Sequence, residues 1–266
     1  MLTSIFLGVL VGAVLGLTGA GGGILAVPAL VVGMGWPMQQ AAPVALIAVA
    51  GSAAIGAAEA FRRQLVRYKA AALMALAGVP VTGIGIRVAQ ILPQRVLLGL
   101  FACVMLVVAG RLFLQARHAK NQDGASEQRW ARMDPVTGRL AWNWTTAFLL
   151  AGIGGATGFM TGLLGVGGGF VIVPMLRRFT DVSMHGIVAT SLLVIALVGF
   201  GGVITSVAHG TTFPLALTAY FTAATALGML VGRQASGRLS ARHVQMGFAS
   251  VLVVVALGLL VKAIAA

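Results

Sequence analysis

Long apolar runs separated by short polar gaps dominate the hydrophobicity pattern of this 266-residue chain. Ten apolar segments can be drawn, five on each side of one polar stretch. They cover roughly residues 2–17, 24–35, 41–60, 70–88 and 96–114, and then 144–163, 170–176, 186–207, 215–231 and 245–264. The third, fourth and fifth segments of each half approach the roughly 20 residues that span a bilayer as a helix. The second segment of each half is too short to span, which predicts three full spans and one broken or hairpin segment per half.

Composition agrees with a membrane protein. The chain is 59% hydrophobic and only 9% charged, whereas a soluble domain averages about 45–50% apolar and about 25% charged residues. Transmembrane β-strands would alternate apolar and polar residues over roughly ten positions, but runs such as Val251 to Val261 are unbroken. The pattern therefore predicts an all-α, polytopic helical membrane protein, with the lipid bilayer as its main partner.

The net charge of +13 comes from 18 Lys and Arg against five Asp and Glu. In a soluble protein such an excess would suggest nucleic acid as a partner. Here the basic residues lie in the gaps between apolar runs, as the positive-inside bias of membrane proteins produces. We therefore expect no nucleic-acid partner. The single cysteine, Cys103, can form no internal disulfide and is interpreted as a packing residue.

The two halves are a repeat. Residues Gly16 to Leu30 and Gly162 to Leu176 share nine of fifteen positions at an offset of 146, and Leu92 to Arg95 matches Leu239 to Arg242 at an offset of 147. A constant register over a whole half indicates duplication, which is typical of transporter folds. The predicted organisation is a first transmembrane repeat at 1–116, a basic cytoplasmic linker at 117–143 and a second repeat at 144–266.

The charges in the gaps indicate how the halves are oriented. The gap 61–69 holds four basic residues and its counterpart 208–214 has no Lys or Arg, whereas the gap 36–40 has none and its counterpart carries Arg177 and Arg178. This opposite bias predicts inverted-topology repeats. The linker would then lie in the cytoplasm and both termini outside.

The two Gly-x-x-Gly-x-Gly-Gly-Gly motifs, each followed by Val-Pro, are the sharpest chemical feature. Proline is comfortable in the first turn of a helix, so Pro28 predicts that a helix begins near residues 26–28, and Pro174 is assigned the same role. A glycine-lined turn before a helix exposes backbone N–H groups and can bind an anion without Lys or Arg. The candidate substrate-binding glycines are Gly19, Gly21, Gly22, Gly23, Gly165, Gly167, Gly168 and Gly169.

These glycines have two alternative roles. Small residues in membrane helices often serve close helix packing, although two copies in register, each with Val-Pro, favour a substrate role near the membrane midplane. Nucleotide binding is disfavoured because no Walker lysine follows and the flanks are apolar.

Polar side chains elsewhere add little. Thr190 and Ser191 could hydrogen-bond an oxyanion, but bonds back to the helix carbonyls one turn earlier are an equally good account. Arg111 lies near a segment end, where snorkelling to the interface explains it. We find no metal-ligand cluster and no nucleophile–base set, so we expect no metal, no cofactor and no enzymatic activity.

The paired Gly-Leu-x-Gly-x-Gly-Gly-Gly motifs with Val-Pro, the block Met184 to Leu192 and the basic linker resemble the TauE/SafE sulfite exporter family, also called the toluene sulfonate uptake permease family. The resemblance covers essentially the whole chain. It implies a multi-pass permease of the bacterial inner membrane for sulfur-containing anions such as sulfite or organosulfonates. One departure is Ala41 to Leu46, where family members often keep an Ala-Thr-Ser-Leu-like stretch; Pro43 there predicts that the third segment starts at that residue.

The leading hypothesis is a secondary transporter for small sulfur-containing anions that works by alternating access. A passive anion channel with the same site, or a permease for another small anion, is the alternative. The sequence leaves open the anion, the direction of transport, the coupling ion and whether the protein forms a homodimer.

Overall fold

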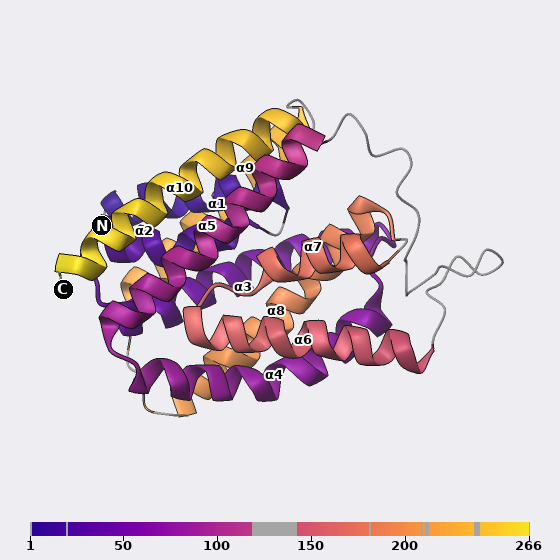
Figure 1. Ribbon diagram of the computed structural model, residues 1–266, viewed down its shortest axis with the longest axis horizontal. Coiled ribbons are helices and arrows are strands. Elements are labelled where there is room, and N and C mark those ends of the chain that lie inside the picture. The colour runs from indigo at the N-terminus through magenta and orange to yellow at the C-terminus, as the bar shows by residue number, and fades with distance from the viewer. Residues whose placement is uncertain are drawn as a thin grey trace.

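The computed structural model describes residues 2–19, 21–118, 143–180, 182–208, 210, 213–236 and 240–265. Regular structure in these ranges is helical (Figure 1). The first half contains α1 (Leu2–Thr18), the short 3₁₀ helix η1 (Gly22–Leu25), α2 (Ala26–Gly33), α3 (Met38–Arg62), α4 (Tyr68–Ile91) and α5 (Gln94–His118). The second half contains α6 (Trp144–Leu164), α7 (Gly169–Phe179), α8 (Met184–Ala208), α9 (Leu215–Ser236) and α10 (Ala241–Ala265). Most of the predicted linker, residues 119–142, lies outside the described residues.

Seven of the described helices are long and apolar enough to cross a membrane: α3, α4, α5, α6, α8, α9 and α10. This confirms the predicted polytopic helical class. The second segments are short, as predicted, since α2 has eight residues and α7 has eleven. The first segments differ slightly, because α6 reaches spanning length whereas α1 has 17 residues.

The prolines mark helix starts less well than predicted. The helix α2 begins at Ala26, so the expectation for Pro28 is confirmed. The expectation for Pro174 is wrong, because α7 begins five residues earlier at Gly169, and Pro43 likewise lies inside α3. Membrane helices tolerate such prolines because neighbouring groups satisfy the freed carbonyl.

Helices of one half pack against helices of the other half, and the packing is symmetric. The first helix of each half packs along the fourth helix of the other, α1 on α9 and α6 on α4. Glycines make this close approach possible: a Cβ at Gly12 would meet the α9 backbone at Thr225, and a Cβ at Gly158 would meet the α4 backbone at Gly78. These two glycines are related by the offset of 146, so the packing role is observed for this part of the glycine pattern.

The third helices of the halves, α3 and α8, pack in the centre and run antiparallel. Along α3, Leu46 contacts Gly202, Ala50 contacts Gly199 and Gly56 contacts Leu192. Residue numbers that rise along α3 therefore meet falling numbers along α8. The fifth helices, α5 and α10, lie side by side on one flank and also run in opposite directions (Figure 1). Antiparallel equivalent helices are the relation that inverted repeats require.

The loops rich in Arg and Lys gather at one end of the molecule. The backbone amide of Arg67, just before α4, donates to Thr190 at the start of α8, and Arg233 near the end of α9 pairs with Glu59 near the end of α3. We call this the basic end; its described basic residues include Arg62, Arg63, Arg67, Lys69, Arg177, Arg178, Arg233 and Arg242. The start of α1 and the end of α10 lie together at the opposite end (Figure 1).

Candidate functional site

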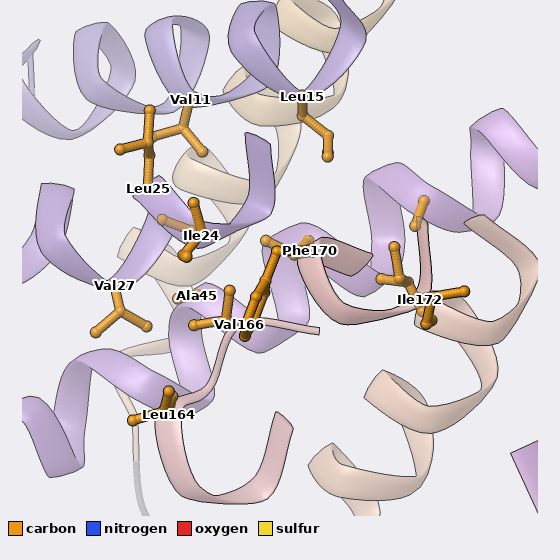
Figure 2. Close-up of a cluster of buried hydrophobic side chains, with 14 of the residues drawn as sticks. Val11, Leu15, Ile24, Leu25, Val27, Ala45, Leu164, Val166, Phe170 and Ile172 are labelled. Carbon is orange, nitrogen blue, oxygen red and sulfur yellow. The ribbon is translucent and has the colours of Figure 1, made fainter. Parts of the chain in front are cut away.

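The two glycine turns meet inside the molecule. A Cβ at Gly23 of the first turn would lie 3.1 Å from the Val166 carbonyl of the second turn and 3.0 Å from the Val49 side chain. Figure 2 shows Ile24, Val166 and Phe170 gathered between the turns. All three side chains are buried. The predicted meeting of the turns therefore occurs, and the layer that joins them is apolar.

The first turn follows the end of α1 at Thr18. Gly19 has a left-handed backbone with φ +83°, and the chain then enters η1 at Gly22. Gly22 packs directly on the α1 backbone at Leu15, where a Cβ would overlap main-chain atoms. This glycine is therefore required for packing.

The second turn has a different backbone. Gly165, Gly167 and Gly168 all have positive φ, at 72°, 76° and 62°, and α7 starts immediately afterwards. The first amides of a helix have no acceptor within the helix, and in α7 these belong to Gly169 and Phe170. A helix N-terminus carries a partial positive charge that favours an anion.

A cavity of about 820 Å³, which we call the wide cavity, lies between the turns and the basic end. Its lining includes four of the predicted site residues, namely Gly19, Gly21, Gly169 and Pro174, together with Phe170. Apolar side chains from α5, α7, α8 and α10 form most of its wall. The wide cavity thus brings parts of both motifs, including the start of α7, to one space.

Basic side chains also line the wide cavity, namely Arg111, Arg177, Arg233 and His185, while no acidic residue is among the described residues of the lining. The guanidinium of Arg233 lies 2.9 Å from the carboxylate of Glu59. The sequence interpretation missed these groups. It expected anion binding without arginine and assigned Arg111 to the membrane interface; α5 continues to His118, so Arg111 lies two turns before the helix end and lines the wide cavity there.

A second, narrow cavity of about 50 Å³ lies toward the opposite end. Its lining repeats that of the wide cavity at the offsets of the duplication. The paired positions, wide cavity first, are Gly16 and Gly162, Leu17 and Leu163, Gly19 and Gly165, Met184 and Met38, His185 and Gln39, Val188 and Ala42, Ala189 and Pro43, Leu192 and Leu46, Ala60 and Ser206, Arg233 and Ile86, and Val244 and Leu97. The molecule therefore contains two equivalent cavities of very different size.

The other predicted site residues lie away from the wide cavity. Gly165 lines the narrow cavity, whereas Gly22, Gly23, Gly167, Gly168 and Pro28 are not among the described lining residues of either one. The Thr190 hydroxyl accepts from the Arg67 amide at 3.1 Å, and the Ser191 hydroxyl donates to the Ile187 carbonyl at 2.8 Å. The bond back to the helix is thus observed for Ser191, and substrate contact by either hydroxyl stays a prediction.

Metal-binding groups do not cluster in the parts of the chain that the structure describes: no three His, Cys, Asp or Glu side chains come together there. The polar side chains of the wide cavity's lining include those of Arg111, Arg177, Arg233, His185, Gln115, Gln245 and Thr18.

Comparison with known proteins identifies the family. The family model described as Sulfite exporter TauE/SafE matches residues 4–259. The probable membrane transporter protein YjnA of Bacillus subtilis (strain 168) is 26% identical over 267 residues, which cover 96% of this chain and 98% of that protein. A probable membrane transporter protein of Xylella fastidiosa (strain 9a5c) is 32% identical over 201 residues, covering 75% of this chain and 71% of that protein.

No solved structure is a significant match to the chain. The family model nevertheless covers both glycine motifs, six of the seven long apolar helices in full and α10 as far as residue 259. The chain therefore belongs to the TauE/SafE sulfite exporter family.

Proposed function

We propose that this protein is a secondary transporter that moves small sulfur-containing anions, such as sulfite or organosulfonates, across the bacterial inner membrane by alternating access. Family membership and the transporter names of its relatives support the class. The observation that carries the mechanism is the pair of equivalent cavities, one of about 820 Å³ and one of about 50 Å³.

The anion would bind at the inner end of the wide cavity. The amides of Gly169 and Phe170 at the start of α7 offer donors and a favourable helix dipole there. Gly19 and Gly21 bring side-chain-free backbone to the same space. Such a site suits an anionic head group, while the apolar walls accommodate the body of an organosulfonate.

Alternating access follows from exchanging the roles of the two halves. The narrow cavity would widen as the wide cavity closes, because both are built from equivalent residues. The apolar layer around Ile24, Val166 and Phe170 would keep the two spaces from opening at the same time, and it would rearrange around the bound anion as one space closes and the other widens. By the positive-inside bias, the basic end would face the cytoplasm.

The test is tracer flux in proteoliposomes. Vesicles are loaded with sulfite, thiosulfate, sulfate or a small sulfonate, opposite a labelled sulfur anion. A carrier predicts uptake that saturates and is accelerated by anion on the opposite side. Flux without such acceleration would favour the channel alternative, and absence of flux for every anion in folded protein would contradict transport of sulfur anions.

A further inference from the structure

The two cavities differ in charge as well as in size, because the equivalent positions of the two halves hold different residue types. Each basic residue that lines the wide cavity has an uncharged partner in the other half. At the offsets of 146 and 147 the pairs are Arg111 and Gly258, Arg177 and Val31, Arg233 and Ile86, and His185 and Gln39. A change of conformation that exchanges the roles of the halves leaves this difference in place.

The described basic side chains of the opposite end lie outside the narrow cavity. Lys262 on α10 is the partner of Gln115 on α5, and its ammonium donates to the Val31 carbonyl at the end of α2, at 2.6 Å. Arg87 near the end of α4 and Arg95 at the start of α5 are also at this end, and none of these three basic residues is among the described lining residues of the narrow cavity. Against this, the wide cavity has three arginines and a histidine.

Arg111 and Arg233 differ in how their charges are compensated. Arg233 is paired with Glu59 at 2.9 Å. Arg111 forms no ion pair with any residue that the structure describes, and it lines the wide cavity from the same face of α5 as Cys103 and Val107. Charge in a cleft with low-dielectric walls is screened less than on an open surface, so it raises the local concentration of counter-ions.

We propose that Arg111, with Arg177 and Arg233, makes the wide cavity an anion-concentrating antechamber, and that the carrier loads anions from the basic end at lower concentration than from the opposite end. The sidedness of loading rests on the proposed transport function. The charge of the antechamber does not, because it is a property of the cavity alone.

The competing account is that these arginines only orient the protein in the membrane, as basic residues of cytoplasmic loops do. That account assigns Arg111 no more influence inside the cavity than Arg178, which is exposed on α7 and is not among the lining residues. Arg178 carries the same charge one residue from Arg177. It is therefore the matched control position.

Cys103 is a native reporter of the cavity's potential, since it is the single cysteine of the chain and lines the wide cavity. The experiment measures its rate of modification by anionic sulfonatoethyl methanethiosulfonate and by cationic trimethylammonioethyl methanethiosulfonate in reconstituted protein. Each rate is divided by the rate for free cysteine in solution. We expect the anionic reagent to be favoured over the cationic one in the unmodified protein.

Arg111→Gln should lower the ratio of anionic to cationic rates about three- to tenfold, because it removes a unit charge that lies about 12 Å along α5 from Cys103. Arg111→Lys should keep the ratio, and Arg178→Gln should leave it within about twofold. A ratio at or below one in the unmodified protein would overturn the proposal, as would equal effects of Arg111→Gln and Arg178→Gln. If Cys103 does not react, a second variant carries the thiol at another lining position, as Met184→Cys with Cys103→Ser. Absence of reaction at both positions would also overturn the proposal.

Sidedness is then measured as the half-saturating concentration of the transported anion at each face, in vesicles of both orientations. We expect the lower value at the basic end and a smaller difference in Arg111→Gln. Equal values with a high thiol-rate ratio would overturn the loading claim while leaving the transporter intact. Absence of flux with the same ratio would instead overturn the proposed function and the loading claim with it.

Discussion

The two glycine turns share nine of fifteen residues, but their backbone conformations differ after Gly19 and Gly165. Gly19 and Gly165 are both left-handed, with φ of 83° and 72°. The next glycine is right-handed in the first turn, where Gly21 has φ −82°, and left-handed in the second, where Gly167 has φ +76°. The first turn then passes through a 3₁₀ helix, whereas the second enters α7 directly.

This difference shows what the motif encodes. Glycine adopts either sign of φ at little cost, so the shared residues allow both backbones and specify neither. The surroundings select between them: the first turn is pressed against the α1 backbone at Leu15, while the start of α7 opens onto the wide cavity. An exchange of these two geometries between the halves would fit the proposed alternating access.

The largest effect is expected at the first turn. Gly22→Ala places a methyl group onto the α1 backbone at Leu15, which cannot rotate away. We expect a loss of about 3 kcal/mol or more in the free energy of unfolding, at or beyond the upper end of overpacking costs. Size-exclusion profiles and thermal midpoints in detergent measure it. A Gly22→Ala protein as stable as the unmodified chain would contradict the packing of the first turn.

At the second turn the obstacle is partly a side chain, so we expect a smaller loss that can be rescued. Gly168→Ala forces an alanine to φ +62° and against the Thr157 methyl group, for a cost of about 1–3 kcal/mol. Thr157→Ser removes that methyl group, so the double variant should regain part of the thermal midpoint. If the double variant is no more stable than Gly168→Ala, the contact with Thr157 is not the cause.

The smallest effect on folding is expected at Gly21. A Cβ there would lie 3.4 Å from the Phe248 ring, an ordinary contact, and Gly21 lines the wide cavity. Gly21→Ala should leave the thermal midpoint within a few degrees but raise the half-saturating anion concentration about three- to tenfold, the loss of a single weak backbone contact. Gly152→Ala in α6, where a Cβ meets nothing within 4 Å, is the control. Equal transport by both variants would remove Gly21 from the site.

Much of the fold could be predicted because span length and hydropathy are local properties. The helix starts at Pro43 and Pro174 were mispredicted because a proline removes one donor but does not by itself end a helix whose neighbours satisfy the freed carbonyl.

The site was only partly predictable. The motifs correctly brought Gly19, Gly21 and Gly169 to one cavity, but Arg111 and Arg233 reach that cavity from α5 and α9 through tertiary packing. The spacing of Cys103, Val107, Arg111 and Gln115 places them on one helical face, and this was the available signal.

Alternating exposure of the two cavities is the central claim, and paired cysteine accessibility tests it most directly. One protein keeps Cys103 in the wide cavity, and the other carries Ser206→Cys with Cys103→Ser in the narrow cavity. With no anion present, the thiol at 103 should react quickly and the thiol at 206, which is buried, slowly. Adding the anion that supports exchange should shift the two rates in opposite directions. Rates that rise or fall together, or that do not respond to a transported anion, would contradict alternating access and favour a channel.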